Sequence, residues 1–189
     1  MIFGITGGTG CGKTTALEAL KTLGGVCLDC DAIYHDLLKT DKALLAAIEG
    51  RFPGVVKAGQ LDRKALGSRV FADPAALADL NAITHAAVKQ KVLELLPKDG
   101  TPAAIDAIGL FESGLDQLCG VTVGILAPKA DRLRRIMARD GISESYAQMR
   151  LDAQPEDSYF REKCDFILEN AGTEADFRRK SLDFFQKFL

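Results

Sequence analysis

The sequence predicts an α/β protein in which helices cover a parallel β-sheet. A short apolar run at residues 2–5 enters a glycine-rich turn, and apolar residues then recur at helical spacing between Lys13 and Leu23. A second short apolar run, at residues 26–28, ends at Asp29. A strand, a turn, a helix and a second strand in this order are typical of proteins with parallel sheets.

The next stretch, residues 32–97, has a helical pattern that is broken at Pro53-Gly54, Gly59 and Pro74. One predicted helix in it extends to Leu96 and carries apolar residues at helical spacing: Leu77, Leu80, Ile83 and Val88. We interpret the stretch as a helical insertion rather than a separate domain.

Three more strands are predicted beyond the insertion, at residues 103–111, 121–127 and 166–169. A charged helical stretch at 129–150 follows the second of them, and a helix at 174–188 follows the third. Strands that alternate with helices in this way favour a single parallel sheet.

The composition is that of an ordinary soluble protein, because 47% of the 189 residues are hydrophobic and 26% are charged. A net charge of −2 favours neither nucleic acid nor an acidic membrane as a partner. No apolar run approaches the ~20 residues of a membrane span, and the first residues lack the features of a signal peptide. We expect a cytoplasmic protein, and no obligate protein partner is evident.

The five cysteines do not form a disulfide framework, because their number is odd and their spacing is irregular. Cys27 and Cys30 form one C-x-x-C pair, but a structural zinc site needs about four ligands and no second pair is present. We interpret the cysteines as reduced, packed thiols.

A phosphate-binding loop is the strongest signal in the chain. Residues 7–14, GGTGCGKT, fit G-x-x-x-x-G-K-[ST] at every position, with a predicted strand before and a helix after. Glycines present backbone N–H groups to phosphate oxygens, and the helix N-terminus adds partial positive charge. Lys13 can reach the β- and γ-phosphates of a nucleotide, while the Thr14 hydroxyl can ligate magnesium.

Cys11 lies inside this loop, and the sequence leaves two interpretations open. The helix N-terminus and Lys13 would lower its pKa and leave the sulfur accessible to thiol reagents. Alternatively, the side chain points into the core behind the loop.

Two acidic residues, Asp29 and Asp31, end the second predicted strand, and ligands gather outside the strand ends of such sheets. During phosphoryl transfer a hydroxyl acceptor must lose its proton, and a nearby carboxylate can take it. We therefore predict a catalytic or substrate-binding role for Asp31; the alternative is that Asp31 caps the following helix.

Three arginines, Arg132, Arg135 and Arg139, share one face of the charged helical stretch, and Arg150 follows. Arginines near a phosphate site can offset charge that develops on the transferring group. Neighbouring aspartates are equally consistent with a solvated face. We favour a functional role for Arg139.

Several short segments form a recognisable series along nearly the whole chain: D-x-D at 29–31, LDRKAL at 61–66, VFAD at 70–73, LNAITH at 80–85, LFE at 110–112, RIMARD at 135–140, Arg150, Gln154 and CDFILENAGT at 164–173. In these segments and in their order, the chain resembles the dephospho-CoA kinases. Two departures lie near the expected acceptor site: Ala86 replaces a proline, and Ile108-Gly109 replaces a Pro-Leu pair.

The resemblance implies a three-layer P-loop kinase core with a five-stranded parallel sheet, a helical substrate-binding insertion and a small helical lid. Residues 1–189 would form one domain. Its core would comprise 1–31, 101–128 and 164–189, its helical substrate region about 32–100, and its lid about 129–163.

The resemblance also implies transfer of the ATP γ-phosphate to the ribose 3′-hydroxyl of dephospho-CoA, the last step of coenzyme A biosynthesis, with Mg²⁺. Asp31 would be the base and Arg139 a charge stabiliser, and Lys13 would act on the phosphates. The implied ATP-binding residues are Gly10, Cys11, Gly12, Lys13, Thr14 and Thr15, with Thr14 on magnesium and Asn170 and Gly172 beside the adenine.

Asp31, His85 and Glu112 would contact the acceptor. For His85 a purely structural role is an equal alternative. Glu112 could bind magnesium through water or hold a pocket arginine. Two rival functions stay open: a kinase for another small hydroxyl or nucleotide acceptor, and a nucleotide-dependent switch, although no N-K-x-D-type motif is present.

Overall fold

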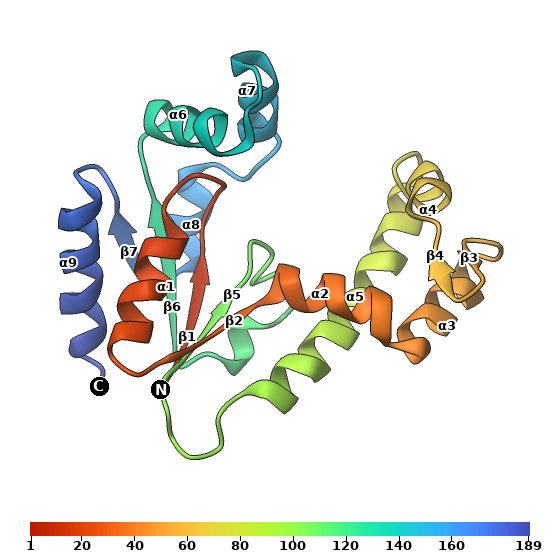
Figure 1. The fold of residues 1–189 in the computed structure, drawn as a ribbon, viewed down its shortest axis with the longest axis horizontal. Coiled ribbons are helices and arrows are strands. Elements are labelled where there is room, and N and C mark those ends of the chain that lie inside the picture. Colours follow the sequence, from red (N-terminus) through yellow and green to blue (C-terminus); the bar gives the residue numbers. More distant parts are fainter. The chain divides into compact units, whose positions relative to one another are not determined.

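The computed structural model describes residues 1–189, which form two compact units (Figure 1). The first unit comprises residues 1–28 and 97–189, and the second comprises residues 29–96. None of the helices, including the 22-residue α5 (Pro74–Leu95), is both long and apolar enough to cross a membrane.

A five-stranded parallel sheet carries the first unit, with the strand order β2-β5-β1-β6-β7. Its strands are β1 (Ile2–Thr6), β2 (Val26–Asp29), β5 (Ala103–Asp106), β6 (Val121–Leu126) and β7 (Phe166–Glu169). The central strand β1 pairs in parallel with β5 on one side and with β6 on the other. Its carboxyl end leads directly into the glycine-rich loop.

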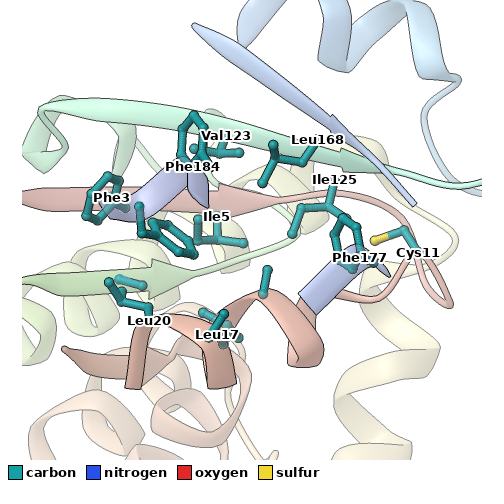
Figure 2. Close-up of a cluster of buried hydrophobic side chains, with 14 of the residues drawn as sticks. Phe3, Ile5, Cys11, Leu17, Leu20, Val123, Ile125, Leu168, Phe177 and Phe184 are labelled. Atoms are coloured by element: carbon teal, nitrogen blue, oxygen red, sulfur yellow. The ribbon is translucent and has the colours of Figure 1, made fainter. Parts of the chain in front are cut away.

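One face of the sheet packs against α1 (Lys13–Thr22) and α9 (Glu174–Gln186), which contact each other. Alternate residues of β1 and β6 point to this face, because side chains alternate along a strand. Figure 2 shows the resulting core, in which Phe3 and Ile5 of β1 lie among side chains of both helices. The rings of Phe3 and Phe185 meet edge to face, with centroids 5.0 Å apart.

The opposite face is covered by α8 (Asp157–Lys163) and by the segment 107–119. Gly4 and Gly124 point this way, and neither position has room for a side chain. A Cβ on Gly4 would lie 2.8 Å from Leu110, and one on Gly124 would lie 3.3 Å from Phe160 of α8. Helices and connecting segments on both faces give three layers, which confirms the predicted fold class.

The charged stretch 129–150 forms two helices rather than one. The first, α6 (Lys129–Asp140), ends at Gly141, and Ser143 caps the second, α7 (Glu144–Asp152). A small apolar cluster of Ile136, Ala147 and Leu151 joins the two helices.

The second unit contains α2 (Cys30–Thr40), α3 (Lys42–Arg51), α4 (Arg63–Val70) and α5, which packs against the other three. Each of the four helices begins at an aspartate whose carboxylate accepts a backbone N–H, the usual N-cap interaction: Asp29, Asp41, Asp62 and Asp73. The predicted helix around Leu77 is confirmed as α5.

Two local predictions in these regions were wrong or incomplete. The strand predicted at 103–111 ends at Asp106, because the chain turns at 108–114, where Ser113 N donates to Gly109 O. Glu112 therefore lies in a turn rather than at a strand end. The hairpin of β3 (Val56–Lys57) and β4 (Gln60–Leu61) was not predicted.

Candidate phosphate-binding site

The loop between β1 and α1 has a shape that only glycine permits at a key position. Gly12 adopts φ 100°, and a Cβ there would lie 2.3 Å from Nδ2 of Asn170. Gly8 is equally enclosed, since a Cβ would lie 2.1 Å from Nη2 of Arg132. The side chains around the loop therefore fit a glycine backbone closely.

The N-terminus of α1 is open to an anion. Gly12 provides no side-chain cap, and the first turn of α1 contains no acidic residue. The terminal N–H groups and the helix dipole thus favour negative charge at this point. Lys13 Nζ donates to the carbonyl of Gly7 at 3.0 Å, and Thr14 is exposed on the first turn.

Arg132 and Gln154 hold the outer part of the loop. Arg132, only 8% exposed, donates from Nε to Thr9 O at 3.0 Å and from Nη2 to Gln154 Oε1 at 2.8 Å. Gln154 accepts the Thr9 N–H at 2.8 Å and donates to the Thr9 hydroxyl at 2.6 Å. This network fixes Thr9 and buries a positive charge beside the loop.

Arg135 and Asn170 hold the inner part. Arg135 Nη1 donates to Gly10 O at 3.1 Å, and its Nη2 lies 3.5 Å from Asn170 Oδ1. Asn170 follows β7, is buried, and donates from Nδ2 to Cys11 O at 2.9 Å. Gly172 lies exposed in the turn before α9.

Arg139 makes different contacts from the other two arginines of its helix face. Its guanidinium donates to both oxygens of Asp140, at 2.6 and 3.0 Å, and Arg150 donates to the same carboxylate at 2.6 Å. The hydrogen bonds from Arg139, and then those from Arg150, lower the pKa of Asp140 to about 2. Arg132 and Arg135 contact the loop, while Arg139 pairs with Asp140 of its own helix, and Arg150 of α7 binds the same carboxylate.

Cys11 belongs to the core. Its side chain is 1% exposed and lies with Ile125 and Phe177 in the apolar cluster (Figure 2). Burial raises the pKa of the thiol, and this effect outweighs the opposing influence of Lys13. The expectation of a lowered pKa and an accessible sulfur was therefore wrong, and the alternative interpretation is confirmed.

Glu112 is held by the α8 region of the same unit. Its carboxylate accepts a hydrogen bond from the Tyr159 hydroxyl. The Nζ of Lys163 lies 5.0 Å from the centroid of the Tyr159 ring and 5.3 Å from that of Phe111. Burial and then the hydrogen bond to Glu112 raise the pKa of Tyr159.

Asp31 and His85 belong to the second unit. Asp29 caps α2, accepting the Ala32 N–H at 3.0 Å, whereas Asp31 is exposed in the first turn. The capping alternative for Asp31 was thus wrong, and its carboxylate is available for another task. His85 is half-buried on α5.

Sequence reasoning did not single out Arg132, Arg135 and Gln154 as the residues that hold the loop. The available signal was weak. The arginines share the helical spacing of Arg139, and Gln154 entered only through the family resemblance.

A family model described as dephospho-CoA kinase, CoaE, matches residues 1–176. The dephospho-CoA kinase of Anaeromyxobacter dehalogenans is 39% identical over 177 residues, which is 90% of this chain and 84% of the relative. That of Thermus thermophilus is 35% identical over 180 residues, covering 95% of this chain and 87% of the relative.

Solved structures agree with these matches. The dephospho-CoA kinase from Campylobacter jejuni has a TM-score of 0.71 and 33% identity, covering 99% of this chain and 96% of its own. TT1252 from Thermus thermophilus has a TM-score of 0.81 and 32% identity, covering 100% and 98%. A shikimate kinase from Acinetobacter baumannii, at 16% identity and a TM-score of 0.51, shares the fold. The chain belongs to the dephospho-CoA kinase family.

Proposed function

We propose that this protein transfers the γ-phosphoryl group of ATP to the ribose 3′-hydroxyl of dephospho-CoA, giving coenzyme A and ADP. The observation that carries the proposal is the glycine loop, which is complete with Lys13 and Thr14 and is held by Arg132, Arg135 and Asn170. Family membership supports the choice of acceptor.

The loop binds the ATP phosphates through residues 10–15, using backbone N–H groups and the N-terminus of α1. Lys13, which donates to the Gly7 carbonyl in this structure, exchanges that contact for the β- and γ-phosphates. The buried charge of Arg132 adds to the attraction, because a cation shielded from water interacts more strongly with an anion.

The residues at the loop also fit Mg²⁺. The exposed hydroxyl of Thr14 follows Lys13 in the first turn of α1, and Asp106 ends β5, the strand beside β1. Mg²⁺ prefers oxygen ligands, and at phosphate sites it commonly binds a protein hydroxyl or carboxylate together with phosphate oxygens. The Thr14 hydroxyl and the Asp106 carboxylate are ligands of these kinds. When bound, the ion neutralises charge on the β- and γ-phosphates.

Asp31 takes the proton from the acceptor hydroxyl, since Asp29 rather than Asp31 caps α2. Arg139 stabilises charge on the transferring group after leaving Asp140. His85 and Glu112 contact the acceptor, and Asn170 and Gly172 lie beside the adenine. In this proposal residues 32–100 bind the acceptor, residues 129–163 act as the lid, and the reaction takes place in the cytoplasm.

One observation favours a second candidate, a kinase for another hydroxyl acceptor. Ile108-Gly109 stands in a turn with Ile108 exposed, at a position where the family usually has a Pro-Leu pair. A different turn would change the shape of the acceptor site.

A coupled assay of ADP release, with and without dephospho-CoA, tests the proposal. We expect release that depends on dephospho-CoA, and a product with the mass of coenzyme A. Faster turnover of shikimate, gluconate or a nucleoside monophosphate would transfer the assignment to the second candidate.

A further inference from the structure

Helix α2 carries a polar stripe that begins at Asp31. His35 and Lys39 follow at i+4 and i+8, so the three side chains share one face of the helix. At a rise of about 1.5 Å per residue, His35 lies about 6 Å along the axis from Asp31, and Lys39 lies about 12 Å from it.

A cavity of about 330 Å³ lies at the far end of the stripe, lined by Leu38, Lys39, Gly59, Gln60, Leu61 and Arg63. Its two charged lining groups are both cations, and neither forms an ion pair with a carboxylate within the protein. The neighbouring cavity of about 550 Å³ differs, because Asp36, Asp41 and Glu94 are among its lining residues. The smaller cavity therefore presents uncompensated positive charge, which suits an anion.

The head of Arg63 is held in place by His35. The guanidinium Nη2 lies 3.3 Å from His35 Nδ1, and because a guanidinium only donates, Nδ1 must accept. Arg63 is the first residue of α4, where the helix dipole disfavours a cation, so the stability of α4 does not account for its position.

We propose that this cavity binds the diphosphate group of the acceptor, with Lys39 and Arg63 supplying the charge and His35 positioning Arg63. The inference rests on the proposed function, because it takes dephospho-CoA as the acceptor. In that molecule only a few covalent bonds separate the ribose 3′-hydroxyl from the diphosphate. Asp31 at one end of the stripe would face the 3′-hydroxyl, and Lys39 and Arg63 at the other end would face the diphosphate.

The test compares Arg63→Gln and Lys39→Gln with the matched control Lys64→Gln. Lys64 is the exposed neighbour of Arg63 on α4 and does not line the cavity. We expect each cavity variant to raise the KM for dephospho-CoA by about tenfold or more, as for the loss of a charge-assisted contact. The KM for ATP should stay within about twofold in all three variants, and the control should behave as the wild type.

Two further acceptor-side measurements identify the group that is bound. Adenosine, which has the 3′-hydroxyl but no phosphate, should be a poor acceptor whose turnover Arg63→Gln leaves unchanged. Inorganic diphosphate should inhibit the wild type competitively with dephospho-CoA and should lose this effect in Arg63→Gln. Inhibition competitive with ATP instead would assign the diphosphate to the nucleotide loop and overturn the proposal.

The positioning role of His35 has its own test. Asparagine offers an acceptor near the place of Nδ1, so His35→Asn should keep the wild-type KM for dephospho-CoA, while His35→Leu should raise it without lowering kcat. An unchanged KM in Arg63→Gln and Lys39→Gln would refute the cavity assignment while leaving the kinase assignment intact. Absence of any dephospho-CoA-dependent ADP release by the wild type would instead refute the proposed function.

Discussion

Replacing Gly12 with alanine tests how closely the loop fits the Asn170 side chain. The new Cβ would lie 2.3 Å from Asn170 Nδ2 and would sit on a residue at φ 100°. The left-handed backbone costs about 1–2 kcal/mol for a residue with a Cβ. Displacing Asn170 breaks its hydrogen bond to Cys11 O, and an unsatisfied buried carbonyl costs about 1–3 kcal/mol. The two effects together predict a loss of about 2–5 kcal/mol.

A double-mutant cycle separates the two terms. Asn170→Ala alone should cost about 1–3 kcal/mol, because it removes the same hydrogen bond. In that background Gly12→Ala should cost only the backbone term, since the hydrogen bond is already lost. The two substitutions should therefore be less than additive, by about 1–3 kcal/mol.

Gly24→Ala is the matched control. Gly24 has φ 85°, and a Cβ there meets nothing within 4 Å, so only the backbone term applies. The free energy of unfolding of the first unit should be measured in urea through the methyl resonances of Ile5 and Ile125, which lie in its core. Additivity of Gly12→Ala and Asn170→Ala within about 0.5 kcal/mol would refute the reasoning.

Three further predictions concern single side chains. Asp31→Asn should lower kcat by about 100-fold or more with little change in the Kd for ATP, the usual scale of general-base catalysis; a near-normal kcat in a steady-state assay would exclude Asp31 as the base. The carboxyl of Asp140 should titrate by NMR with a midpoint of about 2, and Arg150→Gln should raise that midpoint. Because this pKa lies below its ordinary 3.8, the stability that the arginines add is complete above about pH 4 and is lost as the pH falls towards 2. Cys11 should react with a thiol reagent only as the first unit opens, because the thiol is buried and its pKa is raised; rapid labelling of the native protein that Cys11→Ser abolishes would contradict the structure.

The phosphate loop could be predicted in full because its information is local. Eight consecutive residues specify the turn, the lysine and the hydroxyl, and the flanking apolar patterns specify the strand and the helix. The helix around Leu77 was predictable for the same reason, since its period is repeated over many residues.

The surroundings of the loop were less predictable because they depend on contacts distant in sequence. Arg132 reaches Thr9 across 123 positions, and Asn170 reaches Cys11 across 159. Spacing placed Arg132, Arg135 and Arg139 on one face, and the sequence analysis favoured Arg139 among them. The fold then directs two of them to the loop and pairs the third with Asp140.

Short elements were the other source of error. The turn at 108–114 is apolar enough to resemble a continued strand, and the four residues of β3 and β4 are too few to show a period. The alternative of Asp31 as a helix cap was wrong because α2 begins at Cys30 with Asp29 as its cap, and sequence patterns define helix boundaries to within a few residues only.

The position of Cys11 in the core has a consequence for the order in which the protein matures during synthesis. Its sulfur packs beside Phe177 of α9, and Phe177 also lies 3.6 Å from the place where a Cβ of Gly12 would be. A ribosome makes α9 more than 150 residues after the glycine motif. The growing chain therefore contains the glycine motif long before it contains α9, the helix against which the loop packs. We therefore expect the loop to reach its folded shape only when α9 docks, and not when the motif emerges.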